Sequence, residues 1–330
     1  AIADCKTGDD NWPDPPPNPP NPPGPVDGGG GGSNAGGDPN DKITVGFGPQ
    51  GWIRPGDTIL YTVHYENVPT ATAPAAVVLV TDKLDARLDG STLCLGQLGF
   101  NNVDVALPAR ITSFKGRADV STDPNPVDIS AGFASETNTL SWRMASVDPV
   151  TGGDPEDPLA GFLPPNTTNR IGEGYVTFTI RPKPGLVTGD VITNWARIIF
   201  DYNEFMDTPA AVNTIDATAP LSAVASLPDV VRTQTFRVSW AGSDAGSGIA
   251  SYDVLVSVDG GPFAPWLEQT TNTSAFFTGE FERFYAFYSV ARDNVGNIEA
   301  APLPARQRGD HAGGEVGEAQ AVEQLPRPRL

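Results

Sequence analysis

The chain has 330 residues, a formal net charge of −19 and 39% hydrophobic residues. Such an acidic surface repels nucleic-acid phosphates and anionic lipid, so nucleic acid is excluded as a partner, while the hydrophobic content is enough to fill real cores. No segment reaches the roughly 18 consecutive apolar residues of a membrane-spanning helix, and no membrane span is predicted.

The chain begins with a low-complexity leader, predicted over residues 1–41. Residues 13–25 contain nine prolines, and residues 28–37 read GGGGGSNAGG. A polyproline II segment of this length spans roughly 40 Å at about 3.1 Å per residue, and the glycines form a hinge. The leader is therefore expected to act as a linker, or as an arm that docks on a neighbouring copy.

A large antiparallel β-sandwich is predicted over residues 42–216. Apolar residues alternate with polar ones in Thr58–Asn67, Thr139–Ser146 and Gly174–Arg181, which is the period of a strand with one face in the core. Ala75–Thr81 is a continuous apolar run and predicts a strand buried on both faces. Val191–Phe200 predicts one long strand with the Trp195 side chain in the core.

A second, smaller β domain is predicted over residues 217–302, followed by a polar tail over 303–330. Phe236, Val238 and Trp240 alternate toward one face, and Asp259-Gly260-Gly261 indicates a hairpin turn. About seven strands in about 85 residues match the size of an immunoglobulin-like sandwich. The predicted fold class is thus all-β, with two sandwiches in tandem behind a Pro/Gly-rich extension.

Three motifs of the second domain carry a resemblance: Phe236–Trp240 (FRVSW), Gly248–Val256 (GIASYDVLV) and Tyr285–Asn297 (YAFYSVARDNVGN). They resemble bacterial immunoglobulin-like modules of fibronectin type III character. The resemblance implies that Trp240 packs in the core and that Tyr285 and Ala291 lie on the strand that such modules call F.

The first domain resembles a β-sandwich repeat of large secreted bacterial surface proteins. The resemblance is carried by Gly51–Gly56 (GWIRPG), Tyr61–Asn67 (YTVHYEN), Ala73–Asp82 (APAAVVLVTD), Leu84–Thr92 (LDARLDGST), Gly172–Pro182 (GEGYVTFTIRP) and Ala196–Asp201 (ARIIFD). It implies a tandem extracellular scaffold and no catalytic residue.

Acidic loops are the candidates for metal binding. Asp201, Asn203 and Asp207 follow a predicted strand and offer the oxygen ligands that Ca²⁺ prefers, whereas simple turn capping by Asp and Asn is the alternative. A second candidate calcium set in the smaller domain is Asp244, Asp293 and Asn297. Ca²⁺ is the one cofactor expected.

Two tryptophans and two cysteines complete the candidate residues. Trp52 and Trp266 stand beside Gly or Pro and are expected to be exposed, where they would bind a glycan. Cys94 lies in an apolar stretch, which predicts a free thiol buried in the core. The alternative is a disulfide between Cys5 and Cys94, which would form in an oxidising compartment.

The sequence favours an extracellular or cell-surface structural protein without enzymatic activity. Modular β domains behind a spacer are typical of a subunit of a surface or filamentous assembly, and self-association into a homopolymer is expected. The alternative is a carbohydrate- or ligand-binding accessory module of a larger secreted protein. The two histidines are too few for a His-based triad or a zinc site.

Overall fold

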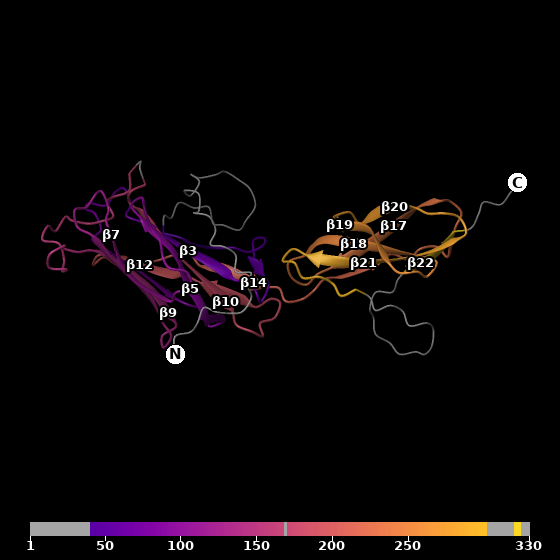
Figure 1. Cartoon of the computed structure of the whole chain (residues 1–330), viewed down its shortest axis with the longest axis horizontal. Helices are drawn as coiled ribbons and strands as arrows, with labels where there is room; N and C mark the ends of the chain where they lie inside the picture. The colour runs from indigo at the N-terminus through magenta and orange to yellow at the C-terminus, as the bar shows by residue number, and fades with distance from the viewer. Residues whose placement is uncertain (1–39, 168–169, 302–319, 325–330) are drawn as a thin grey trace. The chain divides into compact units, whose positions relative to one another are not determined.

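The computed structural model describes residues 40–167, 170–301 and 320–324, and all regular structure in these ranges is β-strand. The described residues form two compact units (Figure 1). The first unit comprises residues 40–186 and 190–215; the second comprises residues 187–189, 216–301 and 320–324. The predicted all-β fold class is confirmed. Residues 1–39 of the predicted leader lie outside the described residues.

The first unit contains three sheets. A five-stranded sheet has the order β1-β3-β10-β5-β6, a six-stranded sheet has the order β13-β12-β4-β9-β8-β7, and a three-stranded sheet has the order β11-β14-β2. The strands are β1 (Lys42–Thr44), β2 (Trp52–Ile53), β3 (Ile59–Glu66), β4 (Val77–Lys83), β5 (Leu88–Phe100), β6 (Val103–Val105), β7 (Ser113–Ala118), β8 (Val127–Ala134), β9 (Thr139–Ser146), β10 (Glu173–Pro182), β11 (Val191–Asn194), β12 (Ala196–Phe200), β13 (Met206–Asp207) and β14 (Ala211–Ile215).

Aromatic side chains join the two larger sheets in the core of the first unit. The ring of Phe178 on β10 lies 5.2 Å from that of Tyr61 on β3 and 5.8 Å from that of Trp142 on β9. All three side chains are fully buried. The alternation predicted for these three strands therefore places their apolar faces against one another, as the period of two requires.

Two strand predictions in the first unit are wrong. Ala75–Thr81 is not buried on both faces: in β4, Val78 and Val80 are buried, but Leu79 on the other face is half-buried. Val191–Phe200 is not one strand, because the chain leaves the β11 sheet and joins the β12 sheet at Trp195. The alternation of buried residues continues from Ile192 to Phe200 and places Trp195 on the other face, so its side chain is 39% exposed instead of in the core.

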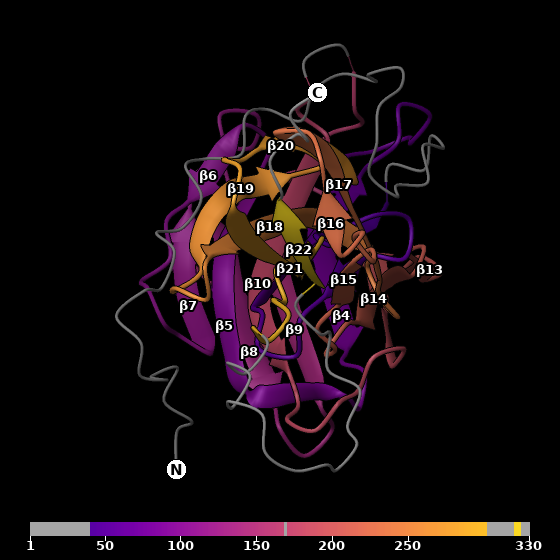
Figure 2. The same ribbon diagram turned by 90° about the vertical axis from the view of Figure 1, so that its right-hand side faces the viewer.

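The second unit contains two sheets, with the orders β15-β17-β20 and β16-β22-β21-β18-β19 (Figure 2). The strands are β15 (Leu221–Val224), β16 (Val230–Val231), β17 (Thr235–Ser243), β18 (Ile249–Val258), β19 (Ala264–Thr270), β20 (Ser274–Thr278), β21 (Arg283–Asp293) and β22 (Gln320–Gln324). Strand β22 lies where the sequence predicts a polar tail. It is short and mostly polar, and its place comes from pairing with β21 and β16.

Edge-to-face aromatic contacts fill the core of the second unit. The Trp266 ring lies 5.3 Å from that of Phe277 and 5.6 Å from that of Phe287, with Trp240 at 6.1 Å. Such contacts add to the burial of apolar area. Trp240 is 2% exposed, so its predicted place in the core is confirmed.

We expect Phe287→Ala to lower the free energy of unfolding of the second unit by about 3–5 kcal/mol, because it empties a fully buried ring site. The matched control is Phe276→Ala, since Phe276 is 71% exposed on β20 and its loss should change stability by about 0.5 kcal/mol or less. Urea denaturation followed by tryptophan fluorescence measures both. Equal losses in the two variants would contradict this description of the core.

Candidate functional site

The first predicted calcium loop carries other interactions. Asp201 Oδ1 accepts the backbone N–H groups of Ala76 at 2.9 Å and Val77 at 2.8 Å, so this carboxylate holds the start of β4. The backbone N–H of Asn203 closes a turn on the carbonyl of Phe200. Asp201 thus binds backbone N–H groups of a distant segment, which differs from the capping of neighbouring backbone that the sequence left as the alternative.

Asp207 has a cationic partner of its own. Its two carboxylate oxygens accept from Arg197 Nε at 2.7 Å and from a terminal guanidinium nitrogen at 2.9 Å. The hydrogen bond from Arg197 lowers the pKa of the Asp207 carboxyl. Asp201 and Asp207 therefore serve different partners, and calcium binding by Asp201, Asn203 and Asp207 stays a prediction.

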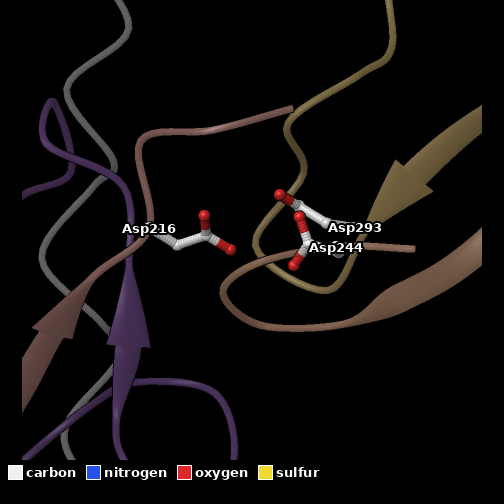
Figure 3. A group of neighbouring side chains, drawn as sticks. All are labelled: Asp216, Asp244 and Asp293. Atoms are coloured by element: carbon white, nitrogen blue, oxygen red, sulfur yellow. The ribbon is translucent and has the colours of Figure 1, made fainter. Parts of the chain in front are cut away.

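Three carboxylates converge in the second unit, as Figure 3 shows. One oxygen each from Asp216, Asp244 and Asp293 lies within 4.8 Å of the others. Asp216 follows β14, Asp244 follows β17, and Asp293 ends β21. The sequence pointed to Asp244 and Asp293 but missed Asp216, which stands at the predicted domain boundary.

Backbone N–H groups hold each carboxylate in place. Ser247 N donates to Asp216 Oδ2 at 2.7 Å, and Gly248 N donates to Asp244 Oδ2 at 2.8 Å. Asp293 Oδ1 accepts from the backbone N–H of Val295 at 3.0 Å, which closes a tight turn after β21. Gly246 has to be glycine, because a Cβ there would overlap the Asp216 carboxylate.

Asn297 braces the cluster. Its Nδ2 donates to Asp293 Oδ2 at 2.7 Å and to the backbone carbonyl of Asp216 at 3.1 Å. Its backbone N–H also donates to Asp293 Oδ1 at 2.7 Å. The sequence suggested Asn297 as a ligand, but its amide nitrogen faces two oxygens of the cluster, so its role is to position them.

The cluster has the charge and spacing that suit a hard cation. Asp216 is 0% and Asp293 is 1% exposed, so water screens their charges poorly. Asp244 Oδ1 and Ser247 Oγ are buried and have no hydrogen-bond partner among the described residues. Two oxygens bound at about 2.4 Å to one Ca²⁺ lie no more than about 4.8 Å apart, and each pair of these carboxylates meets that condition.

The predicted glycan-binding tryptophans differ in their surroundings. Trp266 is half-buried, and its ring packs against Trp240 and Phe287, so the expectation of an exposed ring is wrong. These ring contacts place Trp266 on the core side of β19. Trp52 is half-buried in β2, where it pairs with Phe47. Glycan binding by either residue stays a prediction.

Cys94 lies on β5, where its side chain is buried, as the sequence predicts. Its proposed partner Cys5 lies outside the described residues, so the disulfide between them stays a prediction. The described residues contain no long apolar helix of the kind that crosses a membrane.

A known family model matches part of the chain. Residues 38–112 and 161–214 match a family model described as a domain of unknown function (DUF7619). The search of curated proteins found no similar sequence.

Several solved structures are similar to this chain at low TM-scores. The C-terminal domain of the Streptococcus pyogenes antigen I/II-family protein AspA is 9% identical with a TM-score of 0.36, over 87% of this chain and 100% of that chain. The major pilin BcpA of Bacillus cereus is 12% identical with a TM-score of 0.32, over 87% and 68%. The Corynebacterium diphtheriae major pilin SpaA, described with stabilizing isopeptide bonds, is 12% identical with a TM-score of 0.31, over 88% and 68%.

We expect calcium to raise the melting temperature of the second unit through the three carboxylates, because an ion bound only to the folded state stabilises it. The gain is about 2.7 kcal/mol at a calcium concentration of 100 times Kd. Asp244→Asn should abolish most of this rise. Asp229→Asn, which removes an exposed charge of the same unit, should preserve it.

Differential scanning calorimetry of the full chain, with calcium and with a chelator, measures the effect. A wild-type melting temperature that does not respond to the chelator would rule out the metal centre and leave the three carboxylates as turn caps.

Proposed function

We propose that this chain is an extracellular, non-enzymatic structural protein, a subunit of a bacterial cell-surface or filamentous assembly. Its copies associate when the proline-rich leader of one docks on the first unit of the next. The observation that carries the proposal is a group of exposed aromatic rings around Arg197, in a chain that also contains a polyproline segment.

The group, here called the Arg197 stack, comprises Trp195, Arg197 and Phe205. The guanidinium carbon of Arg197 lies 3.6 Å from the ring centroid of Phe205 and 5.6 Å from that of Trp195. Phe205 is 51% exposed and Trp195 is 39% exposed. Cation–π contact thus holds two solvent-facing rings next to one another.

The stack is pre-organised on a sheet edge. The two bonds between Arg197 and Asp207 fix the guanidinium, and Asp207 belongs to β13, the two-residue edge strand of its sheet. Neighbouring Tyr202 is 98% exposed. Aromatic side chains grouped at an exposed edge mark an interaction site, and rings that are already fixed lose little entropy on binding.

The leader has the chemistry that such a surface binds. Polyproline II segments dock on aromatic-lined surfaces, and their stiffness keeps the entropy cost of binding low. Residues 13–25 contain nine prolines, and their sequence predicts a segment of this kind. A segment of the same chain as the occupant makes every copy both donor and acceptor, which is the arrangement that yields polymers.

The non-enzymatic part of the proposal is supported by the surroundings of His64. Its Nδ1 lies 2.6 Å from Asp41 Oδ1, on the partly exposed side of β3. This pair links the start of β1 to β3. Among the described residues, the hydrogen-bond partner of the His64 ring is thus a carboxylate that joins two strands, and not a nucleophile.

We expect a peptide of residues 10–27 to bind the chain lacking residues 1–39, as measured by fluorescence anisotropy. Phe205→Ala and Trp195→Ala should each weaken binding by about 2 kcal/mol, roughly thirtyfold, because they remove central aromatic contacts. Phe276→Ala removes an exposed ring of the other unit and should leave the affinity unchanged.

Light scattering and electron microscopy of the full chain over a range of concentrations then test assembly. Particles that grow with concentration, and are lost when residues 1–39 are removed, support a neighbouring copy as the acceptor. Strictly monomeric particles at every concentration, with and without calcium, would contradict the assembly.

A further inference from the structure

Three buried polar side chains of the first unit come from three different sheets. Lys42 lies on β1 of the five-stranded sheet, Asp82 on β4 of the six-stranded sheet, and Asn194 on β11 of the three-stranded sheet. Their exposed fractions are 4%, 0% and 1%. Lysine and aspartate are rarely buried so completely, so this group needs an explanation.

Lys42 and Asp82 are in direct contact. Lys42 Nζ donates to Asp82 Oδ2, and neither side chain has any exposed surface. The same nitrogen lies 4.4 Å from the centroid of the Tyr61 ring and 5.1 Å from that of Phe178. The amine is therefore enclosed by aromatic rings and a single carboxylate, in surroundings of low dielectric.

Asn194 is the third member. Its side chain is close enough to favour the ionised form of Asp82. Yet Oδ1 and Nδ2 of Asn194, and Oδ1 of Asp82, are buried without an ordinary hydrogen-bond partner among the described residues. Asn213, also fully buried, donates from Nδ2 to the carbonyls of Val45 and Gly51. An unpaired buried amide is costly, so Asn194 is the exception to explain.

We propose that Lys42 and Asn194 become joined by an intramolecular isopeptide bond, with Asp82 as the group that carries the proton between them. The inference rests on the three side chains of the first unit and does not depend on the assembly role proposed above.

The surroundings favour the protonation states that the reaction needs. Burial lowers the pKa of the Lys42 ammonium to about 8, and burial raises the pKa of the Asp82 carboxyl. Transfer of one proton from Lys42 to Asp82 thus yields a neutral amine next to a carboxylic acid. Both neutral groups are less costly in a dry core than the ion pair.

The step balances without any further reactant. The Lys42 Nζ lone pair attacks Cγ of Asn194, and a tetrahedral intermediate forms. Asp82 gives its proton to the departing nitrogen of Asn194 and takes one from Nζ. The Cγ–Nδ2 bond breaks, ammonia leaves, and an amide joins Nζ to Cγ, with Asp82 protonated beside it. Fixed positions supply the effective concentration that amide exchange in water lacks.

The bond would tie the first strand of the unit to a strand near its end. Lys42 opens β1, the first strand after the leader, and Asn194 closes β11. A pulling force that arrives through the leader would then act on a covalent bond at the first residue of β1, before it reaches the rest of the pairing between β1 and β3. Such a link suits a chain that is held by its leader.

High-resolution mass spectrometry of the intact chain, followed by proteolysis, tests the proposal. We expect the wild-type chain to be lighter than its sequence by one ammonia molecule, with a cross-linked peptide pair containing Lys42 and Asn194 and no tryptic cleavage after Lys42. Lys42→Arg, Asn194→Ala and Asp82→Ala should each restore the full mass. Lys83→Arg, which changes the exposed lysine next to Asp82, should keep the loss.

Two outcomes would overturn the proposal. Loss of one water molecule with a Lys42–Asp82 cross-link would show that Lys42 is joined to Asp82 and not to Asn194. A folded wild-type chain of full mass, cleaved normally after Lys42, would show that Lys42 and Asp82 form only an ion pair. Because the wild-type protein decides both points, failure of a core variant to fold does not affect the test.

Discussion

The contact of Phe178 with Tyr61 and Trp142 holds the two larger sheets of the first unit together. Phe178 lies on the central strand β10, which pairs with both β3 and β5. The same ring and Tyr61 form part of the enclosure around the Lys42 amine. The apolar core and the buried charge are therefore one structure, because displacing the ring would admit water to the ion pair.

A buried ion pair is poor evidence of stability in itself. Removing two charges from water costs more than their attraction returns, unless further hydrogen bonds satisfy them. Here Asp82 Oδ1 and the Asn194 amide lack such bonds among the described residues. The arrangement therefore brings one buried polar side chain from each of three sheets together at a cost in stability.

The sequence predicted the strands best where one face of a strand keeps the same surroundings along its length. Alternation in β3, β9 and β10 located the core strands, because each strand keeps one face against the opposite sheet. It failed at Trp195, since the alternation continues through the point where the chain changes sheet. Strand β22 was missed because pairing with β21 and β16, and not its composition, places it.

The sites were harder to predict than the fold, since their members are brought together only by tertiary structure. Asp244 and Asp293 stand in recognisable turn motifs, but Asp216 joins them from the other side of the predicted domain boundary. Lys42 reads as an ordinary polar residue at the start of a strand. Lys42 is buried because it pairs with Val63 on β3 and because Asp82 faces it from another sheet. Neither contact can be predicted from the residues next to Lys42 in the sequence.

The two units solve the same electrostatic problem in different ways. In the first unit, the chain itself supplies the cation for its buried carboxylate, through Lys42. In the second unit, no Lys or Arg among the described residues forms an ion pair with Asp216, Asp244 or Asp293, although two of these carboxylates are fully buried. Backbone N–H groups donate to each of the three carboxylates, which lie within 4.8 Å of one another. The first unit thus pairs its buried carboxylate with a cation of its own chain, whereas the second unit brings three carboxylates together without a cationic side chain of the described residues beside them.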